Sequence, residues 1–234
     1  MRRYALPLLT SFIILAGCAN AAQQAPKSED DKALYNLGVM LSSSIKNFNL
    51  TSKELELVKA GLADGAQDKA ATDDLEKYVA KLQELQTQRV AAATEKEKAA
   101  GAAYLTKAAA EKGATKTASG LVIKSTSEGT GASPTADNQV KVNYEGRFVD
   151  GKVFDSSIKR NEPATFPLGG VIPCWTEAVQ LMKVGGKAQV VCPPELAYGE
   201  EGRPPQMRGA ATLVFDIELL DIVKGEAPAA APTR

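Results

Sequence analysis

The stretch VIPCWTEAVQLMKVGGKAQVVCPPELAYG, residues 171–199, changes its periodicity partway along. Trp175, Val179 and Met182 share one face of a helix, and the Gly185-Gly186 pair ends that pattern. The residues before and after this helix-like segment alternate between apolar and polar. A large ring at the start of such a short helix, as Trp175 is, can form the floor of a pocket lined from a sheet.

The alternation upstream predicts a β-hairpin. In QVKVNYEGRFVDGKVFDSS, residues 139–157, Asp150-Gly151 is a strong two-residue turn signal, and the strand after it reaches Phe154. The apolar face of the first strand carries Val140, Val142 and Tyr144.

The alternation downstream predicts the last strand. Residues 211–223, ATLVFDIELLDIV, place Asp216 and Glu218 outward. The inward residues are Leu213, Phe215, Ile217 and Leu219. The sequence therefore predicts an α+β fold in which residues 114–225 form an antiparallel sheet wrapped on one short helix.

Residues 28–70 predict a helical dimerisation module. Apolar residues recur at helical spacing, and Thr51 with Glu54 forms a capping box that starts a second helix. Two helices of this size make a poor core, and without cysteine or histidine in the segment a second copy of the chain is the remaining source of burial. Packing against the chain's own C-terminal domain is the alternative. The stripes are Leu34, Leu37, Leu41, Ile45 and Phe48, then Leu55, Val58 and Leu62.

A long connecting helix is expected over residues 71–113. Its proline-free core of about forty residues would span roughly 60 Å at 1.5 Å per residue. The stripe at its start, which includes Leu75 and Leu82, can join the dimer core, whereas the later part has few large apolar residues and is expected to be a solvated spacer. Gly101 is a point at which this helix can bend.

The ends of the chain are expected to lie outside the fold. Residues 1–17 carry two arginines and a short apolar run, as export signals do, and Leu-Ala-Gly-Cys resembles a bacterial lipobox that would lipidate Cys18. Cleavage after residues 19–21 to give a soluble periplasmic protein is the alternative. Residues 18–27 are expected to be a tether and residues 226–234 a disordered tail. The prediction is an outer-membrane lipoprotein of the bacterial cell envelope, facing the periplasm or the cell surface.

Composition excludes several kinds of chemistry. The 28 basic and 28 acidic side chains balance, so no net field directs the protein to nucleic acid. The chain has no histidine, which excludes histidine general bases, histidine-activated nucleophiles and metal sites with an imidazole ligand. We expect no cofactor and no metal.

Three stretches together resemble the FKBP-type peptidyl-prolyl cis-trans isomerases over about residues 118–224. They are VNYEGRFVDGKVFDSS (142–157), residues 171–199 and ATLVFDIELLDI (211–222), in the order that the family has them. The whole layout is similar to the macrophage infectivity potentiator group of that family, whose N-terminal helices intertwine into a homodimer. The resemblance implies an enzyme that assists the folding of exported proteins.

The resemblance also implies a set of site residues. Trp175 would be the pocket floor, Tyr198 and the Ile172 amide would donate to substrate carbonyls, and Asp155 would lie at the mouth, held by Arg160 and Tyr144. The implied catalytic residues are Tyr144, Phe154, Asp155, Tyr198 and Phe215, and the implied substrate-binding residues are Arg160, Phe166, Val171, Ile172, Trp175 and Met207. Any one of these aromatic residues taken alone is more often plain core.

Three departures from the small cytosolic members affect the rim of this site. A lone Gly170 separates Leu168-Gly169 from Val171, and Ala164 stands where an aromatic residue is common. The loop that overhangs the pocket carries Arg203 and Arg208, which either tune the choice of peptide or are ordinary loop variation. Catalysis should survive these changes, while affinity for macrolide inhibitors is left open.

Two functions from different classes follow. The first is a folding isomerase and chaperone whose partners are proline-containing unfolded or exported polypeptides. The second is a surface-exposed protein that binds a partner or host matrix through the FKBP fold. The pocket set favours the first.

The two cysteines outside the leader, Cys174 and Cys192, are expected to form a disulfide. An exported chain lies where disulfides persist, and the resemblance puts the two segments side by side. Two buried free thiols are the alternative. With no histidine to activate it, Cys174 is interpreted as a residue that fixes Trp175 in place.

Overall fold

A computed structural model describes residues 25–69, 75–204 and 206–223. Expectations for the leader (1–17), for Cys18 and for the tail (226–234) fall on residues outside these ranges. The chain divides into two units, Met1–Ser42 and Ser43–Arg234. Within the described ranges, no helix has both the length and the apolar character needed to cross a membrane.

The first unit contains one described helix, α1 (Glu29–Ser42), none of whose residues is buried. The predicted helical stripe does not run on unbroken to Phe48, because a 3-10 helix, η1 (Ser43–Phe48), follows in the second unit. Three successive serines, residues 42–44, explain the change, since serine competes for backbone hydrogen bonds and weakens an α-helix.

Helix α2 (Ser52–Ala66) begins at the predicted capping box. The Thr51 hydroxyl accepts from the Glu54 amide, and the Glu54 carboxylate accepts from the Thr51 amide at 2.8 Å. Arg89 of α3 donates to the same carboxylate and to the Phe48 carbonyl at 2.9 Å. Hydrogen bonds from Arg89, followed by those from Thr51, lower the pKa of Glu54 to about 2. The start of α2 is therefore tied to α3.

Helix α3 (Leu75–Ala109) continues without interruption through Gly101. The expectation of a solvated spacer is wrong for the last turns of the helix. Ala108 is buried against Val122, Val191 and Val214 of the sheet. A Cβ at Gly101 would lie 2.2 Å from the Thr212 Oγ1, so the glycine permits close contact rather than bending. Small residues let this helix approach the sheet without large apolar side chains.

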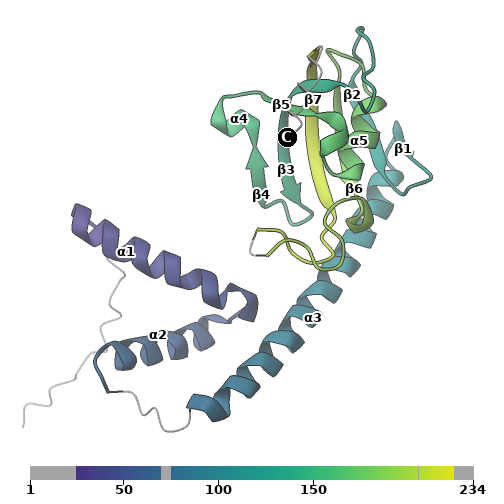
Figure 1. The fold of residues 1–234 in the computed structure, drawn as a ribbon. Coiled ribbons are helices and arrows are strands. Elements are labelled where there is room, and N and C mark those ends of the chain that lie inside the picture. The colour runs from purple at the N-terminus through teal and green to yellow at the C-terminus, as the bar shows by residue number, and fades with distance from the viewer. Residues whose placement is uncertain (1–24, 70–74, 205, 224–234) are drawn as a thin grey trace, which may run out of the picture. The chain divides into compact units, whose positions relative to one another are not determined.

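The sheet is antiparallel, as predicted, with the strand order β1-β2-β6-β7-β3-β4 and with β5 paired to β3 (Figure 1). Its strands are β1 (Ala114–Lys116), β2 (Val122–Ser127), β3 (Gln139–Phe148), β4 (Val153–Ser156), β5 (Ala164–Pro167), β6 (Lys187–Cys192) and β7 (Leu213–Val223). The short elements are α4 (Ser157–Arg160), η2 (Leu168–Gly170), α5 (Pro173–Gln180) and η3 (Pro194–Leu196).

The main core lies between the sheet and α5. Trp175, Val179 and Met182 are all buried in it, as the helical spacing predicted. The inward residues of β7 are buried, whereas Asp216 is exposed. The predicted hairpin is present, but its loop has three residues, 149–151, rather than two. The Phe148 amide donates to the Lys152 carbonyl at 3.0 Å, the Gly151 amide donates to the Phe148 carbonyl at 2.9 Å, and Gly151 alone in this loop has a positive φ, of +87°. The face that carries Val191 and Val214 is covered by the last turns of α3.

Candidate functional site

Trp175 is the centre of an aromatic cluster built from three strands and α5. It stands in the first turn of α5, is 5% exposed and packs edge-to-face with three rings. The ring centroids lie 5.2 Å from Tyr144 on β3, 5.3 Å from Phe166 on β5 and 5.2 Å from Phe215 on β7. Edge-to-face packing fixes the orientation of the indole, since aromatic pairs prefer this geometry.

Phe154 extends the cluster along β4. Its ring centroid lies 5.7 Å from that of Phe215 and 5.1 Å from that of Phe148. A Cβ at Gly146 would lie 2.7 Å from the Phe154 ring and 2.8 Å from the Phe215 ring, so both rings need a glycine there. The sequence reasoning missed Phe148 and Gly146. A glycine inside an alternating strand is a known sign of close approach and was the available signal.

A hydrogen-bonded polar group adjoins the rings. The Tyr144 hydroxyl and the Arg160 guanidinium both donate to the Asp155 carboxylate, and Arg160 also donates to the Tyr144 oxygen at 3.2 Å. These are the three residues that the resemblance implied would meet. They come from β3, β4 and α4, which the hairpin brings together.

Asp155 is held in its ionised form. Burial opposes ionisation, but hydrogen bonds from Tyr144 and Arg160, with the charge of Arg160, keep the pKa of Asp155 below its ordinary value. Burial, aided by the hydrogen bond to Asp155, raises the pKa of Tyr144. At neutral pH the group is therefore a carboxylate, a phenol and a guanidinium, and none of them is a free base.

The other predicted residues pack against the same core. Val171, Ile172, Tyr198 and Met207 are partly buried on it. Within the part of the chain that the structure describes, the Tyr198 hydroxyl and the Ile172 amide donate to no other group. Both are therefore available as donors to a bound molecule. Arg203 lies beside the Tyr198 ring, with its guanidinium carbon 5.9 Å from the ring centroid.

A disulfide joins Cys174 at the start of α5 to Cys192 at the end of β6, with a Cα–Cα distance of 5.7 Å. Both residues are fully buried. The predicted pairing is thus present, and it attaches the helix that carries Trp175 to the sheet.

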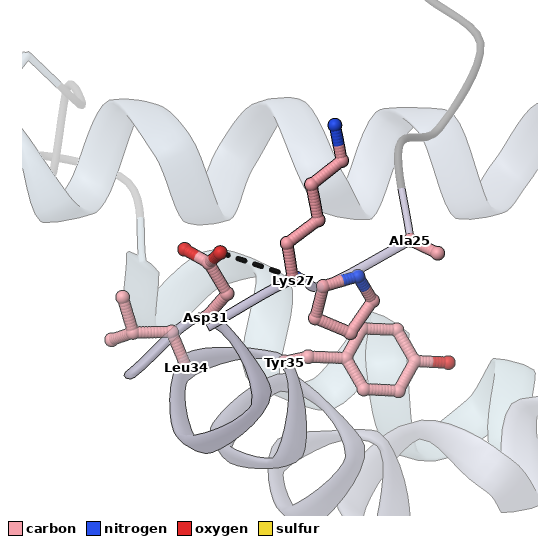
Figure 2. A pocket seen from close by; sticks show the side chains of 6 residues that line it. Ala25, Lys27, Asp31, Leu34 and Tyr35 are labelled. Carbon is pink, nitrogen blue, oxygen red and sulfur yellow. Dashed lines mark hydrogen bonds between the residues drawn. The ribbon is translucent and has the colours of Figure 1, made fainter. Parts of the chain in front are cut away.

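Two hollows are lined by residues outside the aromatic cluster. One, of about 300 Å³, adjoins the start of α1, where Figure 2 shows Leu34 and Tyr35 on the helix and Asp31 bonded to the Lys27 amide. The other, of about 190 Å³, is lined by residues that include Ile158 and Glu218. Neither contains a residue of the predicted set. Among the described residues, no group of three or more histidine, cysteine, aspartate or glutamate side chains could hold a metal ion.

Comparison with known proteins finds similarity to one family along most of the chain. Residues 131–220 match the family model described as FKBP-type peptidyl-prolyl cis-trans isomerase, and residues 30–124 match that of the domain amino-terminal to it. A probable FKBP-type isomerase FkpA from Neisseria meningitidis is 41% identical over 215 residues, covering 87% of this chain and 78% of the relative. The isomerase Mip of Coxiella burnetii is 35% identical, covering 96% of this chain and 100% of the relative. The crystal structure of FkpA from Escherichia coli aligns with a TM-score of 0.63 at 37% identity, covering 85% of this chain and 98% of that one.

Proposed function

The chain belongs to the FKBP-type peptidyl-prolyl cis-trans isomerases and isomerises X-Pro bonds, and we propose that it does so at the aromatic cluster around Trp175. The observation that supports this placement most is the edge-to-face packing of three rings with one indole, next to the Tyr198 hydroxyl and the Ile172 amide, which have no partner among the described residues. The prolyl ring would lie over Trp175, between the rings of Phe154, Phe166 and Phe215. The same cluster is the proposed site for macrolide inhibitors.

The chemistry of the reaction suits these residues. Rotation about an X-Pro bond passes through a twisted state without amide resonance, over a barrier of about 20 kcal/mol, and needs no nucleophile. A twisted amide is less dipolar than a planar one, so an apolar aromatic surface favours the transition state over the ground state. Tyr198 and the Ile172 amide would hold the flanking carbonyls while the bond turns.

Replacing Asp155 with alanine tests the placement. The change removes the acceptor shared by Tyr144 and Arg160, and we expect kcat/KM for a proline-containing tetrapeptide to fall by about tenfold or more. Asp137→Ala is the matched control, because Asp137 is an exposed carboxylate without a described partner. Equal activity in Asp155→Ala and Asp137→Ala contradicts the placement of the site at the Trp175 cluster. A wild-type protein without isomerase activity contradicts the isomerase function and favours a binding protein.

We further propose that the protein is a homodimer that holds unfolded exported chains between its isomerase domains. Support comes from the N-terminal helices, whose apolar residues the single chain leaves uncovered. On α1, Leu34, Leu37 and Leu41 are 67%, 51% and 48% exposed, and no residue of α1 or α2 is buried. Water contact on such stripes is unfavourable, and a second copy would remove it.

A charge on the α1 stripe should separate the dimer. We expect Leu37→Glu to sediment as a monomer at micromolar concentration and to lose its ability to suppress aggregation of an unfolded client, while its peptide isomerase activity persists. Asn36→Glu adds the same charge outside the stripe and should remain dimeric. A dimeric Leu37→Glu protein, measured by analytical ultracentrifugation, contradicts this assembly.

For location we propose an outer-membrane lipoprotein anchored through Cys18. The lipobox-like residues 15–18 behind a short apolar run support this, and the soluble periplasmic form is the alternative. A diacyl or triacyl mass at Cys18 in the mature protein is the expected result, and an unmodified N-terminus at a later residue contradicts it.

A further inference from the structure

One face of α3 contacts the isomerase domain over three turns. Its apolar end is formed by Tyr104, Leu105 and Ala108, which pack on the sheet. The same face continues N-terminally through Gly101 to Lys98 and Glu97, at the three- and four-residue spacing of a helical stripe. These last two positions are charged, so a search for apolar periodicity does not detect them.

Both charged residues pair with the connection between Tyr198 and β7. The Glu97 carboxylate accepts from the Arg208 Nη1 at 2.6 Å, and the Lys98 Nζ lies 2.7 Å from the Glu200 carboxylate. The Glu97 side chain is only 16% exposed, so its pair is less screened by water than the usual surface pair. Two ion pairs on adjacent helix positions therefore attach both arms of this connection to α3.

Arg208 reaches from α3 to the aromatic cluster. Its second nitrogen donates to Asp150 in the β3–β4 turn at 2.8 Å, and its guanidinium carbon lies 4.4 Å from the centre of the Phe148 ring. Phe148 is 3% exposed and touches Phe154, a wall of the proposed substrate site. Arg208 is thus held by two carboxylates and stacked on a ring behind that wall.

The connection itself carries substrate-facing groups. It begins at Tyr198 and includes Met207, whose amide and carbonyl both bond with Arg203. The Ala210 amide donates to the Gly199 carbonyl at 2.9 Å and closes its base. Glu200 and Arg208, the two residues paired with α3, lie next to that base. Movement of either would be transmitted to Tyr198 and Met207.

We propose that Glu97 and Arg208 are positioning residues for prolyl isomerisation. They make α3 a structural part of the catalytic domain, because the helix holds the Tyr198–β7 connection and the Phe148–Phe154 wall in the geometry that binds substrate. The proposal rests on the placement of substrate at the Trp175 cluster.

The test uses the full chain with Glu97→Ala, Arg208→Ala and the double variant. We expect each single change to lower kcat/KM for a proline-containing tetrapeptide by about three- to tenfold, mainly through KM, because the binding groups lose their alignment. The double variant should lose no more than Arg208→Ala alone, since Glu97 acts through Arg208. Hydrogen exchange at the Ala210 amide should quicken in Glu97→Ala.

Glu84→Ala is the matched control, because it removes a carboxylate of α3 that pairs with Lys81 at 3.0 Å and contacts no residue of the connection. The proposal is overturned if Glu97→Ala behaves as Glu84→Ala does in KM and in exchange, or if the two single losses multiply in the double variant. The two proposals fail differently. If Asp155→Ala keeps full activity while Glu97→Ala loses activity, the placement of substrate at the Trp175 cluster is wrong. If Asp155→Ala loses activity while Glu97→Ala keeps it, the role proposed for α3 is wrong.

Discussion

Trp175→Ala is expected to lower the free energy of unfolding by about 3–5 kcal/mol, the usual cost of deleting a buried aromatic side chain. The indole is 5% exposed and meets three rings at centroid distances of 5.2 to 5.3 Å, so its removal leaves a space that those rings cannot all fill. Urea denaturation followed by circular dichroism measures the change. Isomerase activity should fall with it, because the proposed floor of the site is gone.

Two comparisons separate the packing effect from a catalytic one. Trp175→Phe keeps a ring edge for its neighbours and should lose less stability than Trp175→Ala. Gln180 lies on the same helix, and its side chain donates to the Thr176 carbonyl. The stability of Gln180→Ala should stay near that of the wild type. A Trp175→Ala protein as stable as Gln180→Ala contradicts the view of Trp175 as the centre of the cluster.

Much of the catalytic domain could be predicted because its residues alternate in register with the structure. The inward residues of β7 and the buried face of α5 follow directly from period 2 and period 3.6. The hairpin could be predicted because its loop needs a positive φ, which glycine adopts readily, and Gly151 supplies it; the loop length of three residues rather than two was not predicted. The spacing of apolar residues was enough to predict these elements, because burying one face of a strand or helix allows only one orientation of that element.

The association of α3 with the sheet could not be predicted in the same way. Its contact uses alanines, a glycine and two charged residues, so it carries little of the apolar periodicity that marks a buried face. Gly101 is informative only when Thr212, over a hundred positions later, is known to lie against it. The role of Arg208 depends in the same way on three distant partners, Glu97, Asp150 and Phe148.

The proposed set of site residues rests on resemblance rather than on pattern. A phenylalanine on an alternating strand is equally compatible with a core and with a binding surface, and the structure shows that several do pack as core. The cluster is distinguished by the polar group of Tyr144, Asp155 and Arg160 beside it and by the donors of Tyr198 and Ile172, which have no partner among the described residues. Only the folded chain brings these features together.

Removal of the Cys174–Cys192 disulfide is expected to lower the free energy of unfolding by about 3 kcal/mol, because the bridge closes a short loop in the unfolded chain. The two residues are 18 positions apart, with fully buried side chains. Urea denaturation of the wild type with and without a reductant measures the difference. The variants Cys174→Ala and Cys192→Ala should both resemble the reduced protein, and adding reductant should not destabilise either of them further.

The same experiment decides whether the bridge also positions Trp175. If the disulfide only restricts the unfolded chain, a reduced protein that is still fully folded keeps the kcat/KM of the oxidised one. If it fixes the first turn of α5, kcat/KM falls while circular dichroism is unchanged, since Trp175 follows Cys174 directly. A thiol-reactive probe that labels both residues in unfolded, unreduced protein, with peptide mapping to separate any label on Cys18, would contradict the bridge. We expect kcat/KM to fall in the reduced, folded protein, because the indole packs against three rings of the sheet and the disulfide holds its helix to that sheet.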